Sequence, residues 1–591
     1  MKKDKKFIYI LILLICFLPR LKLASMSEPL RTLSDELSTI NGAAILAGYD
    51  WSGVVSNAGY YGFGSSFLLG FLFRLFNNPV LIYRIFLGIF ALIQSIPGVV
   101  AYYILSDLYP KKNKALLALI SIMLSYIVAV RANVFYNEHF MILASWLIAL
   151  MFYMLIKHGD NRKLKVLYTS LLMVIIAISL LLHTRSQIYL IALALTVVLY
   201  LIIYRKSFLN LLTAVSLSVA GITLINLFIK LYQLHVWGTT HVRNASVNLN
   251  VDGSSVELFD RIKAILMIFT GQLNTFSLIS GSLITLAVLL IISVLIKALL
   301  NKDYRSNSNS SIILITGGFF SLCFFGTMLA QSISWSSGLV KNITEGTSNS
   351  YYPALTYIRY AAPYFGPMLL AGFIAFFEDE KIGKYLCVAN IVLIILMQLH
   401  WVKYIVPYCV RSTSNSSPYI CFSFSQLWTM NTFPYKFSVI VLIGIALLTG
   451  VMFYLKKYIP ALLLLCIFMV YQYSYNAISY DITIQKQNSG GPLSVYNYVT
   501  ENDMLADIPK NRLYGLDLRD VSNHQTYYLT QFYFFDYPVN IEIPESYDTP
   551  FLIVTNSVNQ VLKKLRQDAN YEIVTFPEYF YSIIKYVPED V

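Results

Sequence analysis

Charged residues are scarce in this chain. Asp, Glu, Lys and Arg make up only 13% of its 591 residues, whereas hydrophobic residues make up 57%. A soluble globular chain carries about 25% charged residues, so this composition cannot cover a water-facing surface of such length. The apolar residues instead occur in separate runs of about 17–25, the length that crosses a bilayer as a helix. These features predict a polytopic α-helical membrane protein.

Metal-binding motifs are missing. The six cysteines contain no Cys-x-x-Cys pair, which argues against a zinc site, and no Asp-x-Asp pair indicates a metal site for a nucleotide sugar. We therefore expect no required cofactor; a divalent metal is compatible with the sequence but not indicated. Cys409 and Cys421 share one polar loop and would form a disulfide in an oxidising compartment. The alternative is two small apolar residues packed against lipid or protein.

A basic face with interleaved aromatic residues, as in nucleic-acid-binding proteins, is also absent. The formal net charge is +13, but Lys and Arg mostly fall in short breaks between apolar runs. Short loops rich in Lys and Arg mark the cytoplasmic side of a membrane protein. We assign to this side the breaks 110–114, 156–165, 204–207, 297–305, 377–384 and 455–458. The break at 377–384 fits least well because it also carries acidic residues.

The apolar runs predict about thirteen transmembrane helices, the first within residues 7–24. A cleaved signal peptide is the alternative there, but Arg20 and Lys22 stand where a cleavage site needs small residues. Residues 65–76 are too short to span and predict an interfacial helix with Arg74 snorkelling. The later spans are 79–106, 114–130, 139–156, 164–182, 188–204, 208–230, 275–297, 312–331, 360–377, 384–400, 437–455 and 458–475. This alternation places the N-terminus in the cytoplasm and the C-terminal end outside.

The C-terminal end differs in composition from the rest. We divide the chain into a transmembrane domain, 1–478, and a small extracytoplasmic α/β domain, 479–591. A helix is predicted over 558–567. Strands are predicted over 512–519, 526–535, 550–557, 571–576 and 581–587.

Candidate catalytic residues lie in the first outside loop, 25–78. Asp35 and Glu36 are adjacent just past the first span. A carboxylate at a membrane surface, partly shielded from water, can have a raised pKa and serve as a general base. The alternative is a solvated pair, or charges favoured at a helix N-terminus.

Further polar residues come from other loops predicted on the same face. Arginine binds phosphate oxygens in a bidentate fashion, and a carboxylate beside it suits activation of a hydroxyl. Together they predict a site for a phosphate-linked substrate at the outer surface; ordinary interfacial residues are the alternative. The second-loop residues are Asn137, Glu138 and His139, and the candidate phosphate ligands are Arg131, Arg185 and Arg359.

Four segments, in this order, resemble the GT-C superfamily of membrane glycosyltransferases, including bacterial relatives of aminoarabinose transferase and protein O-mannosyltransferases. The segments are SDELSTINGAAILAGYDWS, NVFYNEHF, TRSQIYLIAL and YIRYAAPYFGPMLLAG. The resemblance implies a polyprenyl-phosphate sugar donor, inverting transfer on the non-cytoplasmic face, and a cell-envelope acceptor that is a glycan, lipid or protein. It further implies that Asp35 is the base, Glu36 supports it or orients the acceptor, Glu138 and His139 lie near the site, and Arg359 contacts the donor phosphate.

The chain departs from many relatives in two places. It has Tyr136-Asn137-Glu138-His139 where they have Ser-Glu-Asn, and Ile358 before Arg359 where they have glycine. Other functions therefore stay open. A glycan polymerase or ligase with a diphosphate-linked donor needs the same outside charges. A polysaccharide transporter or flippase would need polar residues along several spans, for which Gln94, Gln272, Gln331 and Gln398 are candidates.

Overall fold

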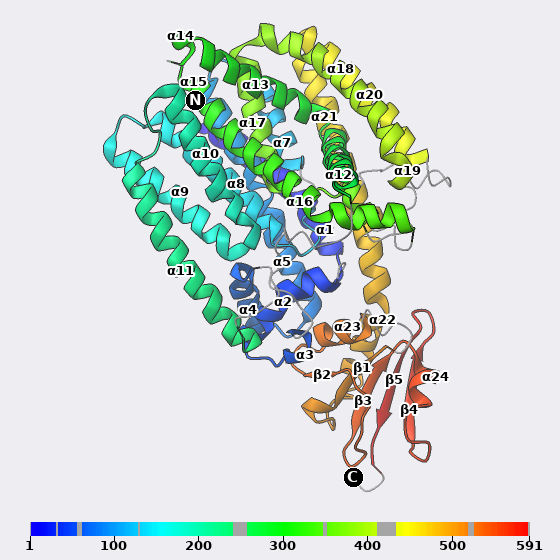
Figure 1. Cartoon of the computed structure of the whole chain (residues 1–591). Coiled ribbons are helices and arrows are strands. Elements are labelled where there is room, and N and C mark those ends of the chain that lie inside the picture. The colour runs from blue at the N-terminus through cyan, green and yellow to red at the C-terminus, as the bar shows by residue number, and fades with distance from the viewer. Residues whose placement is uncertain are drawn as a thin grey trace.

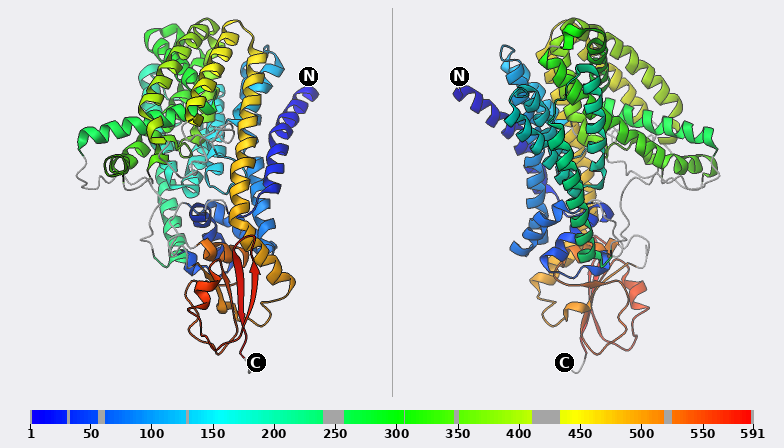
Figure 2. Two further views of the ribbon diagram at one scale, coloured as in Figure 1. Left: turned by 90° about the vertical axis from the view of Figure 1, so that its right-hand side faces the viewer. Right: turned by 60° about the vertical axis from the view of Figure 1, so that its left-hand side comes forward.

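The computed structural model of the chain is a bundle of helices with a small sheet domain at one end (Figure 1). It describes residues 2–30, 33–55, 62–127, 130–239, 257–305, 307–346, 351–409, 433–517 and 525–588. The N-terminus and the C-terminal domain lie at opposite ends of the molecule (Figure 2).

The body consists of helices and short helical turns. They are α1 (Lys2–Met26), α2 (Leu33–Ala47), α3 (Ser52–Val55), α4 (Gly64–Leu75), α5 (Pro79–Ile93), α6 (Ile96–Leu108), α7 (Lys114–Tyr126), α8 (Glu138–Lys157), α9 (Arg162–Leu182), η1 (Thr184–Ser186), α10 (Gln187–Tyr204), α11 (Leu211–Trp237), α12 (Leu258–Ile279), α13 (Leu283–Leu300), α14 (Lys302–Arg305), α15 (Ser308–Ile312), η2 (Ile313–Gly317), α16 (Gly318–Glu345), η3 (Tyr352–Thr356), α17 (Ala362–Glu378), α18 (Glu380–Tyr404), α19 (Val406–Cys409), α20 (Phe433–Tyr454), α21 (Tyr458–Asn476), η5 (Ala477–Ile482) and α22 (Thr483–Glu501).

The predicted membrane fold is confirmed. Among the described residues, 11 helical segments are long and apolar enough to cross a membrane, and every predicted span contains a helix. The spans predicted at 114–130, 360–377 and 437–455 correspond to shorter apolar helices. The expected interfacial helix is α4, where Arg74 donates a hydrogen bond to the carbonyl of Leu46 at 2.6 Å.

One helix begins between the predicted spans 208–230 and 275–297, where no helix was predicted. This helix, α12, ends before Gly281 and Ser282, whose positive φ angles of 54° and 72° break the chain direction. Figure 1 shows α12 end-on, whereas α8 and α10 run along the bundle. The sequence alone did not reveal it because the polar residues of its first half hide the apolar pattern.

The basic breaks meet at one end of the bundle, as predicted. Lys112 and Tyr458 both contact Glu380, and Lys297 pairs with Asp379 at 2.5 Å. The acidic residues at 377–384 are thus partners for Lys side chains of neighbouring breaks, which explains why they occur there. Two further hydrogen bonds connect the other breaks. Lys165 donates to the carbonyl of Ser207, and Arg305 donates to the carbonyl of Ile203.

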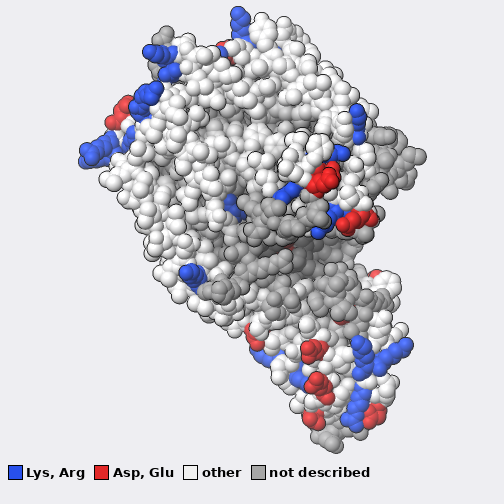
Figure 3. Space-filling model, viewed as in Figure 1, with Lys and Arg blue, Asp and Glu red and all other residues white. Residues whose placement is uncertain are grey.

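The surface charges follow this arrangement. Lys and Arg gather at the end of the bundle that carries the breaks, and both signs occur on the C-terminal domain (Figure 3). The broad surface between them is mostly uncharged, as a lipid-facing surface must be.

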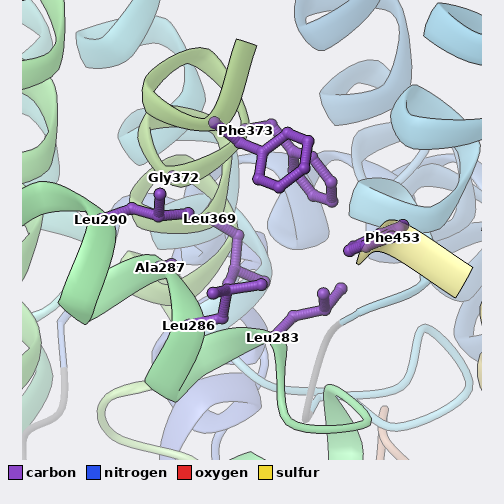
Figure 4. Close-up of a pocket in the computed structure, with 9 residues that line it drawn as sticks. Leu283, Leu286, Ala287, Leu290, Leu369, Gly372, Phe373 and Phe453 are labelled. Atoms are coloured by element: carbon purple, nitrogen blue, oxygen red, sulfur yellow. The ribbon is translucent and has the colours of Figure 1, made fainter. Parts of the chain in front are cut away.

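An apolar pocket lies among α13, α17 and α20 (Figure 4). Phe376 and Phe453 at its edge directly precede basic breaks, so the pocket lies toward that end of the bundle. Its lining contains no titratable side chain and therefore cannot perform acid–base chemistry. The lining residues are Leu283, Leu286, Ala287, Leu290, Leu369, Gly372, Phe373, Phe376 and Phe453.

The C-terminal domain contains a five-stranded mixed sheet of order β2-β1-β3-β5-β4. Strands β1 and β3 are parallel with Leu513 opposite Leu552, and β3 and β5 are antiparallel with Ile553 opposite Ile584. Side chains of β1, β3 and β5 are buried on both faces of the sheet. The elements are η6 (Lys510–Arg512), β1 (Leu513–Leu516), α23 (Gln525–Tyr533), β2 (Val539–Asn540), β3 (Phe551–Thr555), α24 (Val558–Leu562), β4 (Tyr571–Phe576) and β5 (Tyr581–Tyr586).

The strand predicted at 526–535 is wrong, because this segment forms the helix α23. Its aromatic residues favour a strand by propensity, but propensity in strands mostly reflects packing on a half-buried surface. Here α23 is buried between the sheet and the helices of the first loop. It approaches β1 so closely that a Cβ on Gly515 would lie 2.8 Å from the Cα of Tyr527.

The last span continues into the C-terminal domain without a break. Helices α21, η5 and α22 follow one another directly through the boundary predicted at 478/479. The domain also packs against the first loop, where the indole of Trp51 donates a hydrogen bond to the carbonyl of Phe535 at 3.0 Å. The domain is therefore part of one structure with the helical body.

The predicted orientation gives a first test. Lys381 lies at the basic end and Glu572 on the C-terminal domain, and both side chains are exposed. We expect a membrane-impermeant maleimide to label Glu572→Cys in intact cells, and to label Lys381→Cys only after the cells are permeabilised. The unsubstituted chain sets the background from its own cysteines. The opposite pattern would reverse the assigned orientation.

Candidate functional site

Four charged side chains from distant parts of the chain meet at the end of the bundle nearer the C-terminal domain. Nη1 of Arg359 lies 2.6 Å from Oδ2 of Asp35, and Nε of Arg359 lies 3.1 Å from Oε1 of Glu138. Nη1 of Arg185 lies 3.4 Å from the same oxygen of Glu138. The structure thus brings together one predicted residue from each of four loops.

Local structure explains how each carboxylate is presented. Asp35 lies in the first turn of α2 and Glu138 is the first residue of α8. The unpaired backbone N–H groups of a helix N-terminus favour negative charge at these positions. Because both helices begin at the same end of the bundle, both carboxylates reach Arg359, and Glu138 also reaches Arg185.

The four side chains differ in their access to solvent. Arg359, Glu138 and Arg185 expose only 4%, 5% and 8% of their side chains, whereas Asp35 exposes 25%. The buried charges are compensated by one another, as buried charges must be. Asp35 is therefore the member of this group that a second reactant reaches most easily.

Tyrosine rings enclose both arginines. The guanidinium carbon of Arg185 lies 3.0 Å from the ring centroid of Tyr360, and that of Arg359 lies 4.4 Å from the ring of Tyr136. Such cation–π contacts are stronger where water is excluded. Burial and the charges of Arg185 and Arg359 lower the pKa of His183, which lies beside them, so its imidazole stays neutral.

Some polar atoms beside the arginines are buried without a hydrogen-bond partner in the part of the chain that the structure describes. They are the amide nitrogen of Asn137, the hydroxyls of Thr184 and Ser186, and Nε of Arg185. Few buried polar groups in native proteins lack a partner, so each such group calls for an explanation. A polar ligand or ordered water molecules would supply the missing partners.

Glu36 points away from the four-residue network. Its Oε1 accepts hydrogen bonds from the hydroxyl of Tyr83 at 2.7 Å and from the backbone N–H of Phe135 at 2.8 Å, and its side chain is fully buried. Adjacent residues on a helix do not share a face, so the side chains of Asp35 and Glu36 contact different residues. Glu36 connects the first loop to the second.

The other second-loop candidates make structural contacts. Oδ1 of Asn137 accepts a hydrogen bond from Ser65 at 2.6 Å. The imidazole of His139 lies between the side chain of Gln94 and the carbonyl of Val134, at 2.9 Å from each. His139 is fully buried, and its contacts connect the second loop to Gln94.

Arg131 forms a buried ion pair with Asp481 of η5. Its Nη2 donates to Oδ1 of Asp481 at 2.8 Å, and its Nε contacts Oδ2. The side chains are 5% and 0% exposed, so this pair is closed to solvent. Sequence analysis missed Asp481 because nothing in the sequence connects positions 350 residues apart.

The predicted disulfide lies outside what the structure describes. Cys421 and the side chain of Cys409 fall outside the described residues, so their disulfide stays a prediction. Within the described ranges, no group of three or more His, Cys, Asp and Glu side chains is placed to hold a metal ion.

Comparison with known proteins identifies the fold. No protein-family model matches the chain, and no curated protein sequence matches it significantly. Among solved structures, the chain is similar to ArnT from Cupriavidus metallidurans bound to undecaprenyl phosphate, with a TM-score of 0.51, 12% identity, and coverage of 98% of both chains. The apo state of that protein gives a TM-score of 0.50 and 10% identity over 98% of this chain and 97% of that one. The chain therefore has the fold of this protein over nearly its whole length, and the predicted GT-C-like fold is confirmed.

Proposed function

We propose that this chain is a membrane glycosyltransferase that moves a sugar from a polyprenyl-phosphate donor to a cell-envelope acceptor on the outer face of the membrane. The observation that carries the proposal is the meeting of Asp35, Glu138, Arg185 and Arg359 in a chain of GT-C-like fold. The presence of undecaprenyl phosphate in the solved complex of ArnT supports the choice of donor class.

The proposed reaction is an inverting displacement. The acceptor hydroxyl attacks the anomeric carbon, the bond from that carbon to the phosphate oxygen breaks, and its electron pair leaves with polyprenyl phosphate. Asp35 takes the proton of the hydroxyl. Its pairing with Arg359 favours the ionised form, and its partial exposure lets the acceptor approach.

The two arginines act on the leaving group. Preorganised cations aimed at a phosphate stabilise the charge that develops there as the bond breaks. Glu138 holds Arg185 and Arg359 toward each other, because one of its oxygens contacts both. The reaction so written needs no metal, and the acceptor class stays open among glycan, lipid and protein.

Arg131 and Glu36 receive other roles in this proposal. Arg131 has both ends of its guanidinium engaged by Asp481, so we assign it to positioning the second loop rather than to phosphate binding. Glu36 likewise positions the second loop through Tyr83 and the backbone of Phe135.

The role of Asp35 is tested by Asp35→Asn in purified protein reconstituted in nanodiscs. We expect sugar transfer from a radiolabelled undecaprenyl-phosphate sugar to fall by about 10²–10⁴-fold, because the amide cannot accept the proton. The control is Asp50→Asn, which makes the same change at an exposed position of the same loop. Normal turnover by Asp35→Asn would refute Asp35 as the base.

The arginines are tested by replacement at Arg359. We expect Arg359→Ala to lower kcat/KM for the donor by about 10²–10³-fold, because it loses both carboxylate contacts and a leaving-group cation. Arg359→Lys should recover only part of this loss, since an ammonium lacks the planar fork. Arg566→Ala, at an exposed ion pair of the C-terminal domain, is the control. Equal losses in both alanine variants would contradict the assignment.

The positioning role of Arg131 predicts thermodynamic coupling with Asp481. Removing one partner of a buried ion pair leaves the other charge uncompensated and costs about 3–5 kcal/mol. We therefore expect Arg131→Met and Asp481→Leu each to lower the apparent melting temperature. In the double variant, the melting temperature should fall by less than the sum of the two single losses. Additive losses would show that the two residues act independently.

A further inference from the structure

A glutamine in the middle of α16 is buried with no hydrogen-bond partner among the described residues. Gln331 is 1% exposed, and neither its amide nitrogen nor its amide oxygen has a hydrogen-bond partner in the described part of the chain. The other interior glutamines considered as a transport path are engaged: Nε2 of Gln94 bonds to the carbonyl of Val130, that of Gln272 to the carbonyl of Ala354, and that of Gln398 to Asn274. The amide oxygens of Gln272 and Gln398 also lack a described partner, but among these four glutamines only Gln331 has neither end of its amide engaged in the part of the chain that the structure describes.

The neighbours of Gln331 along α16 place it beside the site. Trp335, one turn later on the same face, has its ring 5.1 Å from that of Tyr357 and 6.0 Å from that of Tyr360. Thr327, one turn earlier, lies beside Tyr364. Gln331 therefore lies level with the turn from Tyr360 to Tyr364, and the ring of Tyr360 covers Arg185.

A second packing contact agrees with this placement. Gly326 faces the start of α10, where a Cβ on Gly326 would lie 3.2 Å from the side chain of Ile188. Because α16 and α10 run in opposite directions, Gln331, five residues further along α16, lies level with η1, on a face about 140° round the helix from that of Gly326. That turn carries the buried, unpartnered hydroxyls of Thr184 and Ser186.

We propose that Gln331 recognises the sugar of the donor, an inference that rests on the proposed function. An ionised phosphate offers only acceptors and can satisfy the amide nitrogen alone. The amide oxygen needs a donor, and sugar hydroxyls are both donors and acceptors. The hydroxyls of Thr184 and Ser186 suit the same ligand, and Trp335 and Tyr357 provide aromatic faces for the apolar side of a sugar ring.

The test compares lipids with and without a sugar. Binding of undecaprenyl phosphate and of its glucosyl, mannosyl and arabinosyl derivatives is measured in nanodiscs for the wild type, Gln331→Leu and Gln398→Leu. The wild type should prefer at least one sugar-bearing lipid over undecaprenyl phosphate. Gln331→Leu should lose about tenfold in affinity for that lipid and keep its affinity for undecaprenyl phosphate.

Stability provides an independent readout. Replacing a buried, unpartnered amide by an apolar group of similar size removes a desolvation penalty, so Gln331→Leu should melt no lower than the wild type. Gln398→Leu breaks a formed bond to Asn274 and should melt lower, with its sugar preference intact.

The outcomes separate the two proposals. If Gln331→Leu keeps the wild-type preference, or if the wild type binds undecaprenyl phosphate and the three derivatives equally, the role of Gln331 is refuted while the proposed function stands. If the wild type binds none of the four lipids, both fail.

Discussion

The ion pairs of Arg359 with Asp35 and Glu138 are the interaction on which the site depends. They join the start of α2, the start of α8 and the segment before α17 through one buried guanidinium. A buried cation is stable only when its charge is compensated, and two carboxylates are held near each other most readily by a cation between them. The position of the candidate base and the charge of the proposed phosphate site are therefore set by the same contact.

A second set of contacts fixes the loop that carries Glu138. The continuous helical run of α21, η5 and α22 contacts this loop at three places. The hydroxyl of Tyr473 accepts a hydrogen bond from the backbone N–H of Ala132, and Asp481 pairs with Arg131. Gln485 donates a hydrogen bond to the carbonyl of Asn133. The same run continues into the C-terminal domain, which binds the first loop through Trp51. The domain thus braces both loops that supply carboxylates, in addition to any contact with an acceptor.

Much of this architecture could be predicted from the sequence because the membrane imposes strong patterns. Apolar runs located the spans, and Lys and Arg in short breaks located one end of the bundle, which the contacts of Glu380 and Asp379 confirm. The members of the central network could be predicted because charge in a short outside loop is conspicuous in a chain with few charges.

The direction of each side chain could not be predicted in this way. Asp35 and Glu36 are equivalent by composition, and only the helix geometry of α2 directs one to Arg359 and the other to Tyr83. Arg131 and Arg185 also occupy similar positions in their loops, but the partner of Arg131 comes from a helix far along the chain. Helix α23 formed against strand propensity because tertiary burial decided its conformation.

The central claim is that Arg185 and Arg359 bind the phosphate of a polyprenyl-phosphate donor beside Asp35. The most direct measurement is an electron cryomicroscopy structure of the full chain in nanodiscs with undecaprenyl phosphate added. We expect phosphate density within hydrogen-bond distance of both guanidinium groups, with the carboxylate of Asp35 facing the adjacent space. A phosphate bound elsewhere, with both arginines still paired only to carboxylates, would contradict it.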